Sequence, residues 1–151
     1  MAHHGGYFGR YLPSGHLVYV HRGTLFAIPF DLAHLKTRGT PVPVLDDVAG
    51  AVNQAAGQLD FSGASNTPGI LVYLSGKAGD PVRALASMDS IGKTQTLLTT
   101  TEAITPRISP DGKRVALSMG GNILLYNLER GVTTRLTVNG LLNNSPIWTT
   151  D

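Results

Sequence analysis

Short strand-like runs alternate with tight turns between residues 105 and 137, and this alternation limits the possible folds more than any other feature. The runs are 105–109, 114–119, 123–128 and 132–137. Pro110-Asp111-Gly112 separates the first two, because Pro presets φ, Asp bonds to nearby backbone and Gly accepts a positive φ. Turns at 120–122 and 129–131 separate the others. The pattern predicts a four-stranded antiparallel sheet.

The third of these runs is apolar on both faces. Ile123 and Leu125 would point to one side, and Leu124, Tyr126 and Leu128 to the other. A sheet with one face in water would alternate apolar and polar residues instead. The sequence therefore predicts a sheet that is packed between two neighbours.

The same pattern recurs along the chain. Residues 97–99 match 135–137 at a spacing of 38, and residues 28–32 match 124–128. Repeats of about 40–50 residues with four short strands each are typical of β-propeller blades. We therefore predict an all-β fold, a partial β-propeller of about three four-stranded antiparallel blades in one domain over 1–151. The predicted blades are 7–48, 59–102 and 104–138, followed by an orphan inner strand at 144–149.

Four segments carry a family resemblance: Ser109-Pro110-Asp111-Gly112-Lys113, Leu125-Tyr126-Asn127-Leu128, Thr134-Arg135-Leu136-Thr137 and Pro146-Ile147-Trp148. On these residues the chain resembles the TolB-like β-propeller repeats of bacterial proteins. Its first blade is similar to propeller segments in the C-terminal regions of bacterial Ser/Thr kinases. The resemblance implies a bacterial protein and a ring of about six blades, of which this chain would supply about half.

The composition is that of a globular protein, and it limits the classes of partner that we expect. Charged residues make up 15% and apolar residues 42% of the chain, and no Cys is present for disulfide or thiolate chemistry. The formal charge is +2 with scattered Lys and Arg, so we expect no nucleic-acid partner. No apolar run reaches the roughly 18–20 residues of a membrane helix, and no secretory signal is recognisable. We expect no membrane partner and a cytoplasmic location, or a periplasmic one if the chain belongs to an exported protein.

Catalytic and metal-binding patterns are weak. The sequence has no Gly-x-Ser-x-Gly elbow, and His21-Arg22-Gly23 lacks the Asp that follows His-Arg in a kinase catalytic loop. His16 and His21 have no third zinc ligand beside them, and the turn already explains Asp111. We therefore expect a protein that is not an enzyme, with no cofactor and no metal.

Binding is the function class that remains. The inner strands of a propeller line an axial channel, and loops at one rim commonly contact ligands. Arg10, Asp60 and Arg107 are the candidate binding residues of the channel or rim. The alternative for Arg107 is a structural ion pair with a carboxylate.

The sequence is compatible with two functions of this class. The first is a non-catalytic protein-interaction or scaffold module, a half-propeller that self-associates as a homodimer to complete about six blades. Pro146, Ile147 and Trp148 would form the oligomer interface, with Ile147 and Trp148 pairing with strands of the partner copy. The alternative is a ligand-sensing propeller fragment of a larger bacterial sensor or kinase, which binds a peptide or small molecule in the axial channel.

Overall fold

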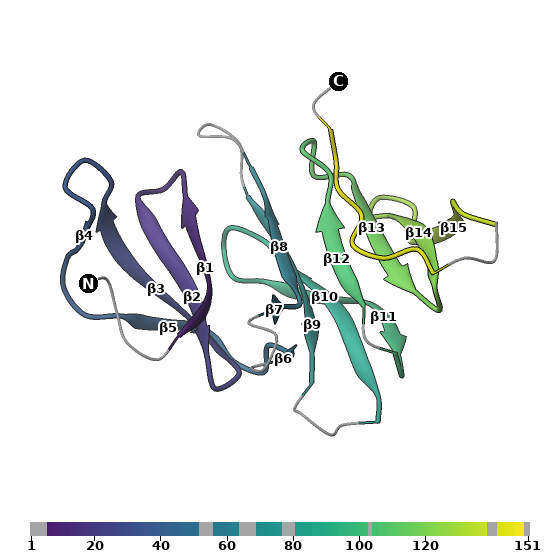
Figure 1. The fold of residues 1–151 in the computed structure, drawn as a ribbon, viewed down its shortest axis with the longest axis horizontal. Coiled ribbons are helices and arrows are strands. Elements are labelled where there is room, and N and C mark those ends of the chain that lie inside the picture. The colour runs from purple at the N-terminus through teal and green to yellow at the C-terminus, as the bar shows by residue number, and fades with distance from the viewer. Residues whose placement is uncertain are drawn as a thin grey trace. The chain divides into compact units, whose positions relative to one another are not determined.

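Strands make up all the regular structure of the described residues. The computed structural model describes residues 6–51, 56–63, 69–76, 81–102, 104–138 and 142–149, and no helix occurs among them. The chain divides into two compact units, Met1–Gly57 and Gln58–Asp151 (Figure 1). The predicted all-β class is confirmed.

One antiparallel sheet, sheet one, forms most of the first unit. Its strands β1 (Tyr7–Leu12), β2 (His16–His21) and β3 (Thr24–Asp31) follow one another through tight turns. The free edge of β3 pairs with β4 (Lys36–Thr37) at one end and with β5 (Val42–Leu45) at the other. Because β4 and β5 share one edge of the sheet, the five strands occupy four positions across it, as in a four-stranded blade. A short hairpin of β6 (Gly50–Ala51) and β7 (Ala56–Gly57) follows.

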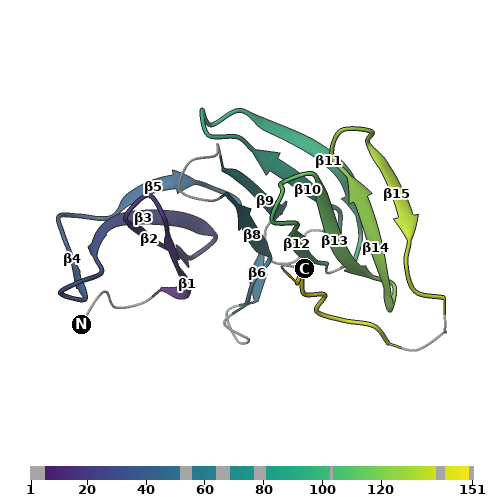
Figure 2. The same cartoon turned by 90° about the horizontal axis from the view of Figure 1, so that it is seen from above.

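The second unit contains two four-stranded sheets, each built by strands that pair in chain order (Figure 2). Sheet two consists of β8 (Leu59–Ser62), β9 (Ile70–Ser75), β10 (Arg83–Met88) and β11 (Thr94–Thr100). Sheet three consists of β12 (Thr105–Ile108), β13 (Arg114–Met119), β14 (Asn122–Asn127) and β15 (Val132–Arg135). All pairs are antiparallel.

The core of the second unit lies between the facing sides of sheets two and three. Strand β12 lies beside β8 and β9. The Tyr126 hydroxyl donates a hydrogen bond to the Leu97 carbonyl oxygen at 3.2 Å, which links the two sheets. Burial of each large aliphatic side chain contributes about 1.5–3 kcal/mol. The fully buried side chains of these sheets include Val72, Leu74, Leu85, Val115 and Leu117.

These three meanders confirm the predicted fold class, a partial β-propeller with about three antiparallel blades. Strand β13 coincides with the predicted run 114–119, and β15 begins at the predicted residue 132. The blade boundaries and the single domain over 1–151 stay predictions.

The C-terminal segment differs from its prediction. We expected an orphan inner strand at 144–149, but residues 142–149 contain no strand. A strand needs a neighbouring strand for its ladder of hydrogen bonds. The inner strand of a blade pairs with the second strand of the same blade, and residues 142–149 have no such neighbour among the described residues.

Candidate functional site

The C-terminal segment lies on one face of sheet three. Strand register places Arg107, Arg114, Ala116, Ser118 and Ile123 on this face, opposite the side that packs on sheet two. Ala116, Ser118 and Ile123 are buried. We call it the tail-bearing face, and we call residues 142–149 the terminal strip. Figure 1 shows the strip, in yellow, running along β12 and β13.

Polar contacts hold the strip on this face. The Ser118 Oγ lies 3.2 Å from the carbonyl oxygen of Asn143 and 3.0 Å from Oδ1 of Asn144, either of which can accept its proton. The Asn143 N–H donates to the Gly121 carbonyl oxygen at 2.9 Å. At the other end, the Trp148 indole N–H donates to the Arg107 carbonyl oxygen at 2.8 Å. The strip is therefore attached at both ends.

The strip also presents apolar side chains to solvent. Leu142 and Ile147 are each 86% exposed. Leu136 and Val138, which follow β15, are exposed as well. Single exposed apolar residues are common, whereas a contiguous patch of them is typical of an interaction site. The strip is thus two-sided, with polar contacts toward its own sheet and apolar groups directed away.

The three predicted interface residues have different environments in this strip. Pro146 is half-buried and Ile147 is exposed. Trp148 is half-buried, and the Arg114 guanidinium carbon lies 5.2 Å from the centroid of its ring. Trp148 therefore already has partners in its own chain, while Ile147 remains open to a partner. Their place in an oligomer interface stays a prediction.

The predicted rim residues Asp60 and Arg107 make backbone contacts. Asp60 Oδ2 accepts the N–H of Ile108 at 3.1 Å, which ties β8 to the edge strand β12. The Arg107 guanidinium donates to the Pro106 carbonyl oxygen at 2.8 Å, and no ion pair with a carboxylate is found for it among the described residues. Both side chains thus stabilise the neighbourhood of β12, and their channel role stays a prediction.

The third rim candidate, Arg10, belongs to the first unit. It is exposed on β1, with its guanidinium carbon 5.3 Å from the centroid of the Phe8 ring. A cation over an exposed ring contributes about 0.5–1 kcal/mol. This contact orients the Arg10 side chain along the surface of sheet one, and its role in ligand binding stays a prediction.

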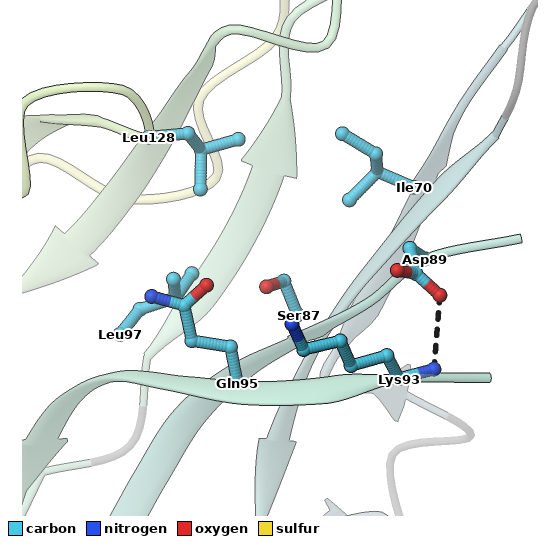
Figure 3. Close-up of a pocket in the computed structure, with 7 residues that line it drawn as sticks. All are labelled: Ile70, Ser87, Asp89, Lys93, Gln95, Leu97 and Leu128. Carbon is cyan, nitrogen blue, oxygen red and sulfur yellow. Dashed lines mark hydrogen bonds between the residues drawn. The ribbon is translucent and has the colours of Figure 1, made fainter. Parts of the chain in front are cut away.

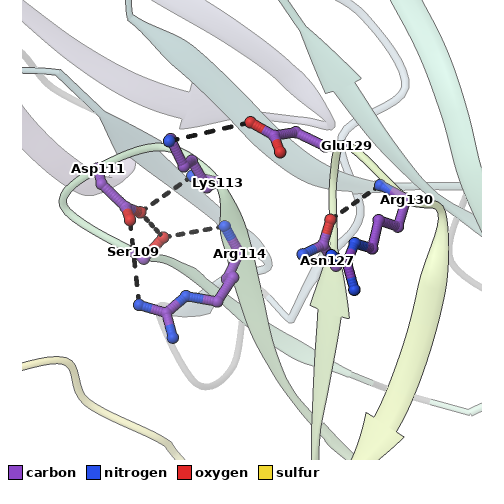
Figure 4. A network of polar contacts seen from close by, with 7 residues as sticks. All are labelled: Ser109, Asp111, Lys113, Arg114, Asn127, Glu129 and Arg130. Carbon is purple, nitrogen blue, oxygen red and sulfur yellow. Dashed lines mark hydrogen bonds and ion pairs between the residues drawn. The ribbon is translucent and has the colours of Figure 1, made fainter.

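The turn between β12 and β13 is held by its own polar residues (Figure 4). Asp111 accepts hydrogen bonds from the Ser109 hydroxyl and from the Lys113 N–H, and Ser109 Oγ accepts the Arg114 N–H. The Ser109 hydrogen bond, followed by that from Lys113, lowers the pKa of Asp111 below its usual value. The carboxylate is therefore used by the turn, as the sequence predicts.

A small hollow lies on sheet two, beside Leu128, which follows β14 of sheet three. Asp89 at its wall accepts the backbone N–H groups of Ile91 and Lys93 at 3.0 and 2.9 Å. Its volume is about 250 Å³, below the roughly 300–1,000 Å³ of small-molecule sites. It therefore does not support the ligand-sensing alternative. Figure 3 shows the lining residues Ile70, Ser87, Asp89, Lys93, Gln95, Leu97 and Leu128.

An aromatic surface on sheet one was not predicted from the sequence. Tyr19 and Phe26 stack with ring centroids 5.7 Å apart, and Tyr11 and Phe30 meet edge to face at 6.1 Å. The His21 ring lies 6.5 Å from Phe26. These side chains share one side of the sheet, which we call the aromatic face. Alternating apolar residues within 17–21 and 26–30 were the available signal, but only the strand register brings Tyr11 to Phe30.

The described residues include no group of three or more His, Asp or Glu side chains arranged to hold a metal ion. His16, which we considered as a ligand from the sequence, lies with its Nδ1 3.1 Å from the Ser14 carbonyl oxygen. In the same described part of the chain, no helix has the length and apolarity needed to cross a membrane.

Comparison with known proteins gives one similar structure. No protein-family model matches the chain, and a search of curated proteins finds no match. The chain is similar to the crystal structure of Porphyromonas gingivalis dipeptidyl peptidase 4, with 17% sequence identity and a TM-score of 0.48. The likeness covers 93% of this chain and 20% of the other, so this chain spans about a fifth of that peptidase's length.

Proposed function

We propose that this chain is a non-catalytic interaction module, a half-propeller that self-associates as a homodimer. The observation that carries the proposal is the two-sided terminal strip. Its polar groups contact Ser118, Gly121 and Arg107 of its own sheet, while Leu142 and Ile147 are 86% exposed. Holding two large aliphatic side chains in water gains nothing for the monomer, whereas their burial against a partner is favourable.

The tail-bearing face supports the same proposal. A propeller blade packs against a neighbour on each of its faces, and sheet three has sheet two on one side. Over its other face the described contacts come from a strip without strands. Two copies of about three blades each would make a closed ring of about six, which covers such faces and edges.

We propose in addition that the chain is a member of the TolB-like repeat family. The Ser109-Pro110-Asp111-Gly112 turn and the β12–β15 meander support a TolB-like repeat of bacterial type. Asp60, Arg107 and Asp111 each hydrogen-bond to backbone of the same chain, so the support for a binding role comes from the terminal strip and not from these side chains.

A charge at Ile147 tests the proposal. Ile147→Asp should raise the dissociation constant of the dimer at least tenfold, because burial in the interface would remove the water that hydrates the carboxylate. Ile91→Asp is the matched control, since Ile91 is 84% exposed in the turn between β10 and β11. Light scattering over a concentration series measures both. Equal masses for the two variants at every concentration would contradict the role of the strip.

A further inference from the structure

The internal repeat shows which face of sheet three corresponds to the aromatic face of sheet one. Residues 28–32 match 124–128, so Ile28 corresponds to Leu124 and Phe30 to Tyr126. Tyr126 lies on the side of sheet three that packs on sheet two, where its hydroxyl bonds to the Leu97 carbonyl oxygen. The aromatic face of sheet one is therefore the counterpart of a blade face that a neighbouring blade covers.

The chemistry of the aromatic face suits a protein partner. Tyr11 is 42% exposed, and Leu17, Phe26 and Phe30 are only half-buried. Aromatic side chains offer a large contact area with few rotatable bonds, and they are enriched at the centres of interfaces. Tyr19 and Ile28 near the centre of this face are buried, so the part that is open to a partner is the end formed by Tyr11 and Phe30.

We infer that the aromatic face receives the terminal strip and tail-bearing face of a second copy of this chain. The inference rests on the self-association proposed above and names its two contact surfaces. Exposed Leu142 and Ile147 would pack on the rings, and the Arg114 guanidinium lies over the Trp148 ring of the same strip. Arg is favourable beside aromatic rings at interfaces.

This pairing joins two different surfaces, so each dimer would contain it twice. The strip of the first copy meets the aromatic face of the second, and the strip of the second meets the aromatic face of the first. A contact between unlike surfaces forms a closed ring when its rotation closes. A substitution on either surface therefore weakens both contacts of a dimer made from one variant.

Two variants, one on each surface, test the pairing. Tyr11→Glu should move the dimer toward monomer to the same extent as Ile147→Asp, at least tenfold in dissociation constant. Val42→Glu is the matched control in the same unit: Val42 is 58% exposed, and its cross-strand partner Ala27 lies on the other side of the sheet from Phe26. Circular dichroism and thermal unfolding of each variant establish that it is folded.

Mixing the two variants gives the decisive result. A heterodimer of Tyr11→Glu and Ile147→Asp copies has both changes in one contact and none in the other. The mixture should therefore regain dimers that neither variant forms alone at the same concentration, as measured by light scattering. A mixture that stays monomeric, or a Tyr11→Glu variant as dimeric as the unmodified chain, would overturn the pairing while leaving self-association intact. An unmodified chain that is monomeric throughout would instead overturn the proposed function.

Discussion

Asp60 shows, at the scale of single residues, how a carboxylate that the sequence pattern assigns to a ligand can satisfy the backbone instead. Strand β12 lies at the edge of sheet three, and the N–H of Ile108 finds its acceptor in Asp60 of the adjacent sheet. A partly buried N–H without an acceptor is costly. The sequence could not show this, because the two residues are 48 positions apart.

Removing the Asp60 carboxylate should destabilise the second unit. We expect Asp60→Ala to lower the free energy of unfolding by about 1–3 kcal/mol, because the Ile108 N–H loses a charged acceptor. Asp60→Asn should cost less, since its amide oxygen can still accept. Urea unfolding measures both. An unchanged free energy of unfolding in Asp60→Ala would show that the carboxylate is not used structurally.

We expect Asp31 to contribute to the acid sensitivity of the first unit. It accepts hydrogen bonds from the Arg38 guanidinium, from His34 Nδ1 at 2.9 Å and from the His34 N–H at 3.1 Å. These bonds, that from Arg38 first, lower the pKa of Asp31 to about 2. An unfolded chain would bind the proton near a pH of about 3.9. The stabilisation is therefore complete above about pH 4 and is lost as the pH falls toward 2.

Asp31→Asn should remove this part of the acid dependence. Between about pH 4 and 2, the urea midpoint of the unmodified chain should fall more steeply than that of the variant. Arg38→Gln should act in the same direction, because it removes the largest cause of the lowered pKa. Identical slopes for all three proteins over this interval would refute the assignment.

At the scale of elements, the turn between β12 and β13 does more than connect two strands. Gly112 has φ of +71°, a region that residues with a Cβ rarely adopt. A Cβ placed there would lie 3.2 Å from Ser62 Oγ of strand β8. The turn therefore also packs on sheet two. Glycine is required at position 112 both by the positive φ and by the limited space for a Cβ.

Comparing two glycines separates these requirements. Gly112→Ala and Gly92→Ala should each cost about 1–2 kcal/mol for the left-handed backbone, since Gly92 has φ of +82°. Only Gly112 has a crowded Cβ position, because nothing lies within 4 Å of the one at Gly92. Gly112→Ala should therefore lower the thermal midpoint more. If the thermal midpoint of Gly112→Ala fell no further than that of Gly92→Ala, the Ser62 side chain would have moved away from the new Cβ without loss of stability.

The bounds of the strands could be predicted where the turn residues between them determine where each strand ends. The Pro-Asp-Gly turn and the two-faced apolar run specified β13 and β14 almost to the residue. The terminal strip was not predictable as such, because its conformation depends on polar contacts with Ser118 and Gly121 far back in the chain. The aromatic face required the register of β1 on β2, which includes an irregularity between Tyr7 and Arg10.

At the scale of the whole molecule, two surfaces of the chain carry exposed apolar side chains. The terminal strip presents Leu142 and Ile147, and the aromatic face presents Tyr11 and Phe30. We propose that joining them between two copies makes a closed ring, in which each blade has a neighbour on both faces. Closure also protects exposed apolar groups that would otherwise favour aggregation.

The mass of the unmodified chain in solution is the first test of the closed ring. Light scattering coupled to size exclusion, over a roughly hundredfold range of concentration, should give a dimer of twice the 16.0 kDa chain mass. The dimer should be the largest species at high concentration, because a closed ring has no free surface for a third copy. A constant mass of 16.0 kDa, or a mass that rises without limit, would contradict the proposed half-propeller.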